Sequence, residues 1–143
     1  MVLLLSDYDI NWLQQRQPLM RYSKNTQIWE GDFSFSLQYQ NKEKITDIYR
    51  IKVDFSDIEA NLPKVYDAGG KIKRSAILAG REIIDMHLYS DGHLCLIHPK
   101  KFKEWYRRGF KLRKFIQHIE THLYWISYVT KYGVEPWAAE PHG

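Results

Sequence analysis

Two stretches in which apolar and polar residues alternate constrain this fold more than any other feature of the chain. Residues 33–39 and 49–55 carry an apolar side chain at every second position. The apolar positions are Phe33, Phe35, Leu37 and Tyr39 in the first stretch and Tyr49, Ile51, Val53 and Phe55 in the second. Because successive strand residues point to opposite faces, each stretch predicts a strand with one buried and one solvated face. The polar segment 41–44 predicts a hairpin loop, so the pair indicates an antiparallel sheet covered on one side.

A first helix is expected before this sheet. Ser6, followed three residues later by Asp9, predicts the N-cap of the helix, and Pro18 is expected to interrupt or end it. The apolar positions with helical spacing are Ile10, Leu13 and Leu19.

The second half of the chain predicts one more strand and a long helix. The strand is expected near residues 64–66, and residues 71–91 are expected to be extended or irregular, with a turn at 90–92. A long helix is predicted from about residue 111 to residue 132, because its apolar residues recur every three or four positions. Gly133 is a suitable C-terminal stop for that helix.

The order of these elements predicts a single α+β domain over residues 1–143, with residues 133–143 as a C-terminal tail. It comprises an N-terminal helix, an antiparallel strand meander, a loop with a cysteine, and C-terminal helices, the first opened by Pro99. A chain of 143 residues with 44% hydrophobic content is long enough to bury one core. No apolar run approaches the roughly 18 to 20 residues of a membrane span. The single cysteine excludes an intramolecular disulfide, so the cytoplasm is the expected compartment.

The net charge of +4 is concentrated near the C-terminus. Residues 1–95 hold 12 basic and 13 acidic residues, whereas residues 96–143 hold 9 and 4. Eight of the basic residues lie between Lys100 and Lys114, and they must stay exposed because unpaired charge is costly to bury. We expect this surface to dock a protein partner. Its expected partner-binding residues are Lys103, Arg107, Arg108 and Lys111.

Cys95 is the candidate nucleophile. If Leu94 and Leu96 point to the core, Cys95 points the other way, and the preceding turn would leave it accessible. Three histidines, namely His87, His93 and His98, lie within eight residues of it and favour a reactive thiolate if they are close in space. The alternative from spacing alone is an inert, buried cysteine.

Two short motifs resemble the ubiquitin-conjugating enzyme superfamily. Leu62–Tyr66 is similar to the Pro-Pro-x-Val-x-Phe that follows that family's strand meander, and Gly92–Leu96 is similar to its Gly-x-Ile-Cys-Leu around the active-site cysteine. The family's His-Pro-Asn is replaced here by Asp85, Met86 and His87. Such departures resemble the stand-alone bacterial relatives found in anti-phage operons, among them the CBASS systems.

The resemblance implies acyl transfer through a Cys95 thioester. The cargo would be the activated C-terminus of a cGAS-like cyclic-oligonucleotide synthase or of a ubiquitin-like protein, and an amine would then attack the thioester. His87 would supply an N–H to the oxyanion in place of the family's asparagine, the alternative being a surface or turn-bonding histidine. His93 would line the groove or be only a solvated residue, and Asp91 would orient the amine or only form the turn. No cofactor is implied. Because the chain has no glycine-rich phosphate loop, either a separate ATP-dependent enzyme activates the cargo or the cargo arrives by another route.

Three alternatives remain open at this point. His87, His93, Cys95 and His98 are metal-ligand types without the paired spacing of a zinc module, and His118 and His122 lie four apart on the long helix. Basic residues interleaved with aromatic ones between Lys100 and Lys114 are also typical of nucleic-acid binding. The missing His-Pro-Asn, finally, leaves room for a binding-only member of the conjugating fold.

Overall fold

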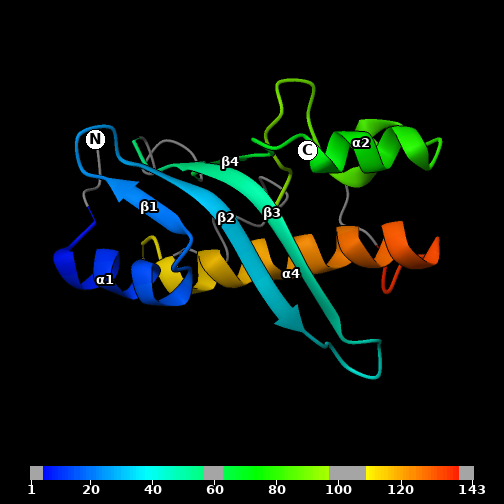
Figure 1. The fold of residues 1–143 in the computed structure, drawn as a ribbon, viewed down its shortest axis with the longest axis horizontal. Coiled ribbons are helices and arrows are strands. Elements are labelled where there is room, and N and C mark those ends of the chain that lie inside the picture. The colour runs from blue at the N-terminus through cyan, green and yellow to red at the C-terminus, as the bar shows by residue number, and fades with distance from the viewer. Residues whose placement is uncertain (1–4, 57–62, 97–108, 139–143) are drawn as a thin grey trace.

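The computed structural model describes residues 5–56, 63–96 and 109–138, and Figure 1 shows the arrangement of their helices and strands. The elements follow the order α1 (Asp7–Arg16), β1 (Met20–Ser23), β2 (Ile28–Leu37), β3 (Ile45–Asp54), β4 (Lys64–Tyr66), α2 (Lys71–Leu78), the 3-10 helix η1 (Ile83–Met86) and α4 (Leu112–Tyr132). This is the predicted α+β class.

The four strands form one antiparallel sheet in the order β1-β2-β3-β4. Strands β2 and β3 confirm the two predicted strands and pair along their whole length, from Leu37 opposite Ile45 near the hairpin to Ile28 opposite Asp54. Strand β4 confirms the strand expected near residues 64–66. Strand β1 was not predicted, because its four residues are too few to show an alternating pattern.

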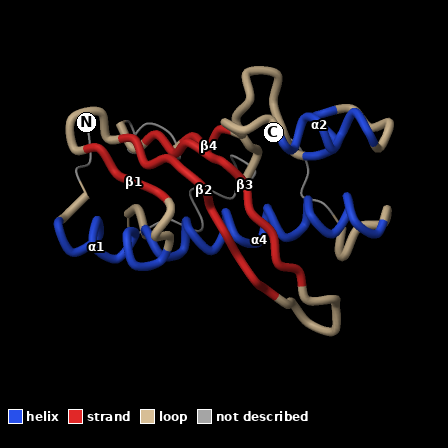
Figure 2. The backbone as a smooth tube through the Cα atoms, in the orientation of Figure 1, coloured by secondary structure: helices blue, strands red, loops and turns tan. Residues whose placement is uncertain are grey.

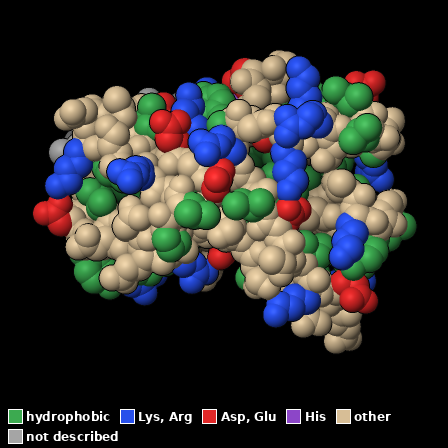
Figure 3. All heavy atoms as spheres, in the orientation of Figure 1, with side chains coloured by type: hydrophobic (Ala, Val, Ile, Leu, Met, Phe, Trp, Pro, Cys, Tyr) green, Lys and Arg blue, Asp and Glu red, His purple; other side chains and the backbone are tan. Residues whose placement is uncertain are grey.

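Helix α4 crosses one face of the sheet, as Figures 1 and 2 show. The apolar residues that predicted this helix are all buried: Leu112, Ile116, Ile119, Leu123 and Ile126. Its start differs from the prediction by one residue, and Gly133 ends it with a φ of +74°. The opposite face of the sheet is solvated, and in Figure 3 acidic and basic side chains are interspersed over the face turned to the viewer. The sheet is therefore covered on one side, as expected.

Helix α1 begins as predicted. The N–H of Asp9 donates to Ser6 Oγ at 3.1 Å, and the helix ends at Arg16, two residues before Pro18. The placement of Leu19 on this helix was wrong: Leu19 follows the helix and is 61% exposed.

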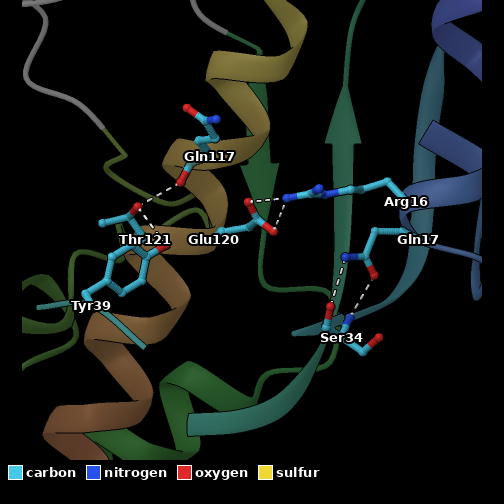
Figure 4. A network of polar contacts seen from close by, with 7 residues as sticks. All are labelled: Arg16, Gln17, Ser34, Tyr39, Gln117, Glu120 and Thr121. Carbon is cyan, nitrogen blue, oxygen red and sulfur yellow. Dashed lines mark hydrogen bonds and ion pairs between the residues drawn. The ribbon is translucent and has the colours of Figure 1, made fainter. Parts of the chain in front are cut away.

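Polar pairs attach α1 to the rest of the domain, as Figure 4 shows. Both carboxylate oxygens of Glu120 on α4 accept from the Arg16 guanidinium, at 3.0 and 2.9 Å. The Gln17 side chain exchanges two hydrogen bonds with the backbone of Ser34 on β2, each of 2.9 Å. Since Glu120 and Gln17 are buried, these bonds supply partners that water cannot.

The expectation of an irregular segment over residues 71–91 was wrong, because α2 and η1 lie within it. The Asp67 carboxylate caps α2 by accepting from the N–H groups of Ile72 at 3.0 Å and Lys73 at 3.4 Å. The helix buries only Ile72 and Ala76, while Ile77 and Leu78 are exposed. The apolar residues therefore do not mark one face, and no helical period was visible in the sequence.

A chain of hydrogen bonds joins α2, β3 and α4. Ser127 Oγ donates to Asp47 Oδ2 at 2.7 Å and lies 2.6 Å from the hydroxyl of Tyr49. The Lys71 ammonium pairs with the other Asp47 oxygen and donates to the carbonyl of Ile48 at 2.8 Å. Partial burial alone would raise the pKa of Asp47, but the hydrogen bonds from Lys71 and Ser127 outweigh it and hold the pKa below its ordinary value. This chain fixes the start of α2, which leads to the candidate site.

Candidate active site

The segment from η1 to Cys95 is a tight backbone hairpin at the edge of the sheet. It is held by isolated bridges between Leu88 and Leu94 and between Tyr66 and His93. The predicted turn is confirmed, since the N–H of Gly92 donates to the carbonyl of Tyr89 at 2.9 Å. The hairpin therefore lies against β4 and carries Cys95 on its second arm.

Backbone hydrogen bonds hold Cys95 from two sides. Its own N–H donates to the carbonyl of His87 at 2.8 Å, and the N–H of Leu94 donates to the carbonyl of Val65 on β4 at 2.7 Å. The thiol also receives a hydrogen bond, because the hydroxyl of Tyr89 lies 3.2 Å from Cys95 Sγ and donates to it. The position of the sulfur is thus fixed relative to the sheet.

The expected accessibility of Cys95 was wrong. The residue is 5% exposed, whereas Leu94 is buried as expected. The alternation of residues 94–96 predicted a strand with one free face. In the structure the first arm of the hairpin and the side chain of Tyr89 lie against this segment, and Leu94 and Cys95 are both buried.

His87 occupies the C-terminal end of η1 in a left-handed conformation, with φ 58° and ψ 38°. Its side chain is buried, and its ring meets those of His122 and Trp125 on α4 edge-on, at centroid distances of 5.5 and 5.1 Å. Burial, together with the nearby His87, lowers the pKa of His122 to about 3, so His122 is neutral at physiological pH. The contacts with α4 place the ring of His87, and its carbonyl holds Cys95. The role of that ring as an oxyanion donor stays a prediction.

Asp91 and His93 form a pair at the tip of the hairpin. The Asp91 carboxylate accepts from the His93 N–H at 3.1 Å and lies 2.5 Å from His93 Nδ1. These bonds, the backbone one foremost, hold the pKa of Asp91 below its ordinary value. Asp91 therefore shapes the turn, and the half-buried His93 ring is oriented by it. Their predicted roles toward a substrate stay predictions.

Sequence reasoning missed Tyr89, the residue whose hydroxyl contacts the candidate nucleophile. The predicted turn at 90–92 contained the signal that could have found it. A three-residue hairpin loop over residues 90–92 places residue 89 beside residue 93, and thus close to the cysteine arm.

Most of the predicted basic surface, namely Lys103, Arg107 and Arg108, lies outside the described residues, as does His98. Lys111 is described and is exposed just before α4. Beyond it, Arg113 donates to the hydroxyl of Tyr8 at 2.9 Å and lies 5.3 Å from the ring centre of Trp12. The docking role of this surface stays a prediction.

Metal-ligand types do not gather in the described ranges, where no group of three His, Cys, Asp or Glu residues could hold a metal ion. Burial, aided by Lys114, lowers the pKa of His118 to about 4. His122 lies on the buried face of α4, next to His87. Within the described part of the chain, no helix has the length and apolar character needed to cross a membrane.

The helices and the four-stranded antiparallel sheet are consistent with a fold like that of the ubiquitin-conjugating enzymes. The chain belongs to the family described as Type II CBASS E2 protein, whose family model matches residues 10–140. This match confirms the resemblance to a stand-alone, CBASS-associated member of the superfamily. It also indicates a role in anti-phage defence with E2-like conjugation. Comparison with curated proteins and with solved structures gave no match.

Proposed function

We propose that this chain is an acyl carrier in which Cys95 accepts the activated C-terminus of a partner protein as a thioester. The observation that carries the proposal is the family match over residues 10–140 in a chain with a single cysteine. A carrier of this kind needs one nucleophile, and a thiolate is the most nucleophilic side-chain group near neutral pH. Cys95 is the one residue of the chain that supplies a thiolate.

The proposed reaction has two steps. In the first, the Cys95 thiol loses its proton to solvent and the sulfur attacks the activated carbonyl carbon. The carbon–sulfur bond forms, and the leaving group departs with the electron pair of its bond to that carbon. In the second step an amine attacks the same carbon, the sulfur leaves as a thiolate, and the new amide nitrogen gives a proton to solvent. Activation of the carboxyl group would come from a separate ATP-dependent enzyme.

The backbone geometry supports this assignment. Transfer requires a sulfur that keeps its place while the carbonyl approaches to about 3 Å. The bonds from Cys95 to His87 and from Leu94 to Val65 hold the backbone that carries the sulfur, and the hydroxyl of Tyr89 contacts the sulfur itself. We therefore assign His87 a positioning role through its carbonyl group, next to the predicted donation by its ring to the oxyanion.

We propose as cargo a cGAS-like cyclic-oligonucleotide synthase or a ubiquitin-like protein of the same operon. The support is the CBASS family assignment, together with the basic surface around Lys111. A partner with an acidic patch would be steered to this surface, chiefly through a faster association rate.

The test is intact mass spectrometry of the chain after co-expression with its operon neighbours. The proposal expects an added mass equal to that of a neighbour minus one water, lost on treatment with a thiol. A stable complex without any covalent adduct would contradict it.

The 5% exposure of Cys95 favours a second candidate, a binding-only member of the fold. That candidate expects the same complex to form with wild-type affinity when Cys95 is replaced by alanine, and no adduct under any condition. The two candidates therefore differ in a single measurement.

A further inference from the structure

The side chain of Tyr89 lies against the buried thiol of Cys95. Cys95 is 5% exposed, and the hydroxyl of Tyr89 donates to its sulfur at 3.2 Å. A carbonyl carbon must come to about 3 Å from the sulfur for the carbon–sulfur bond to form. The hydroxyl of Tyr89 already occupies one side of the sulfur at that distance. Tyr89 therefore lies where it can donate to the sulfur and restrict the approach of a substrate to it.

Tyr89 is itself held in place by the hairpin. Its N–H donates to the carbonyl of His93 at 2.9 Å, and its ring lies on the imidazole of His93 with a centroid distance of 4.4 Å. Asp91 fixes that imidazole through Nδ1, and the ring of Tyr66 meets the imidazole edge-on at a centroid distance of 6.2 Å. Lys52 covers Tyr66 in turn, with its ammonium 4.8 Å from the ring centre. The position of the hydroxyl over the sulfur is thus built by several residues of the hairpin and the sheet.

We propose that Tyr89 holds the Cys95 thiolate and limits access to it until a carbonyl group arrives. A hydroxyl that donates to sulfur favours the charged thiolate over the neutral thiol. When the sulfur becomes part of a thioester it is neutral and a weak acceptor, so the hydroxyl is released from it. The released O–H then lies beside the acyl group, where it donates to the oxyanion that forms as the amine attacks. His93 and Asp91 act through Tyr89 by holding its ring.

The two functions of Tyr89 can be separated by substitution. Tyr89→Phe removes the hydroxyl and keeps the ring, whereas Tyr89→Ala removes both. The probe is iodoacetamide, whose rate of alkylation of Cys95 is measured from pH 5 to pH 10 in the full-length chain. Because the chain has a single cysteine, the modified residue is unambiguous.

We expect Tyr89→Phe to raise the pH midpoint of alkylation by about half a unit to one unit, the size of one charge-assisted hydrogen bond. Tyr89→Ala is expected to raise the midpoint similarly. It should also increase the plateau rate at high pH by at least about tenfold, since opening of the site is no longer required. An unchanged midpoint in Tyr89→Phe would overturn the proposed hold on the thiolate. An unchanged plateau in Tyr89→Ala would overturn the role in access.

Tyr66→Phe is the matched control. It removes a hydroxyl from the same stack and keeps the ring contact with His93. The control is expected to leave the midpoint unchanged, and an equal shift there would also count against Tyr89. Among the described residues, these variants leave intact the titratable groups Asp67, His87, Asp91, His93, His122, Lys52 and Lys64 near the hairpin.

This inference rests on the proposed function for its biological meaning, but its test needs no cargo. A wild-type alkylation profile in Tyr89→Phe rejects the proposed role of Tyr89 but does not contradict the proposed thioester carrier. If co-expression yields no adduct but the alkylation profiles are as predicted, the carrier function is rejected and the role of the contact between Tyr89 and Cys95 is supported. Circular dichroism melts of each variant show whether a changed rate reflects local opening or loss of the fold.

Discussion

Replacing His87 by glycine or by alanine tests the backbone conformation that holds Cys95. Both substitutions remove the ring that packs on His122 and Trp125, so both destabilise the domain by the same loss of contacts. The two variants differ only in the Cβ methyl group of alanine, whose steric cost depends on the backbone conformation. At φ 58° and ψ 38° alanine carries the steric cost of the left-handed region and glycine does not. We therefore expect His87→Gly to be more stable than His87→Ala by about 1 kcal/mol.

The assay is urea unfolding followed by tryptophan fluorescence, for which the chain offers five tryptophans. In a thermal melt of a domain of this size, the same difference corresponds to a shift of the melting temperature of about 2–4 °C. Lys73 in α2 is a matched control, because it is exposed and helical. There the order reverses, and Lys73→Ala should be more stable than Lys73→Gly by about 1 kcal/mol. The same order at both sites would refute the left-handed conformation of His87.

Two further predictions concern charges. Asp47→Asn should lower the free energy of unfolding by about 1 kcal/mol at pH 7, because the carboxylate accepts from Ser127 and pairs with Lys71. Since the folded-state pKa of Asp47 is lowered, its contribution is present above about pH 4 and is lost progressively as the pH falls through the folded value. Urea titrations at pH 7 and pH 3 check this: the difference between variant and wild type should be smaller at pH 3, and a difference of unchanged size would contradict it. Reversing Arg107, Arg108 and Lys111 to glutamate should slow association with the protein partner, most strongly at low salt, as measured by surface plasmon resonance. An unchanged association rate would show that this basic surface is solvated and does not dock the partner. Loss of tight oligonucleotide binding would favour the nucleic-acid alternative.

The parts of the fold that the sequence predicted are those with long periodic patterns. Strands β2 and β3 are ten residues each and α4 has 21. Patterns of this length can be recognised even when a single position departs from them. Helix α2 has eight residues and buries two of them, and the carboxylate that caps it, Asp67, comes from outside the helix. Strand β1 is held by its pairing with β2. Both short elements are stabilised mainly by contacts with other segments, so their own sequences do not predict them.

The candidate site shows the same division. The turn at residues 90–92 was predictable, because an aspartate followed by glycine has strong local preferences. The cover over Cys95 was not, since it depends on the hairpin bringing Tyr89 beside the cysteine arm. The position of the His87 ring depends likewise on α4, more than thirty residues further along the chain. Local patterns carry no information about such contacts, which arise from the tertiary arrangement.

The chemical nature of the bond to Cys95 tests the central claim most directly. The chain is co-expressed with its operon neighbours as wild type, as Cys95→Ser and as Cys95→Ala, and each adduct is measured by intact mass spectrometry before and after treatment with a thiol and with alkali. A thioester carrier predicts a thiol-sensitive adduct on the wild type, a thiol-resistant but alkali-sensitive oxyester on Cys95→Ser, and none on Cys95→Ala. An adduct that persists on Cys95→Ala, or one on the wild type that resists thiol, would contradict it.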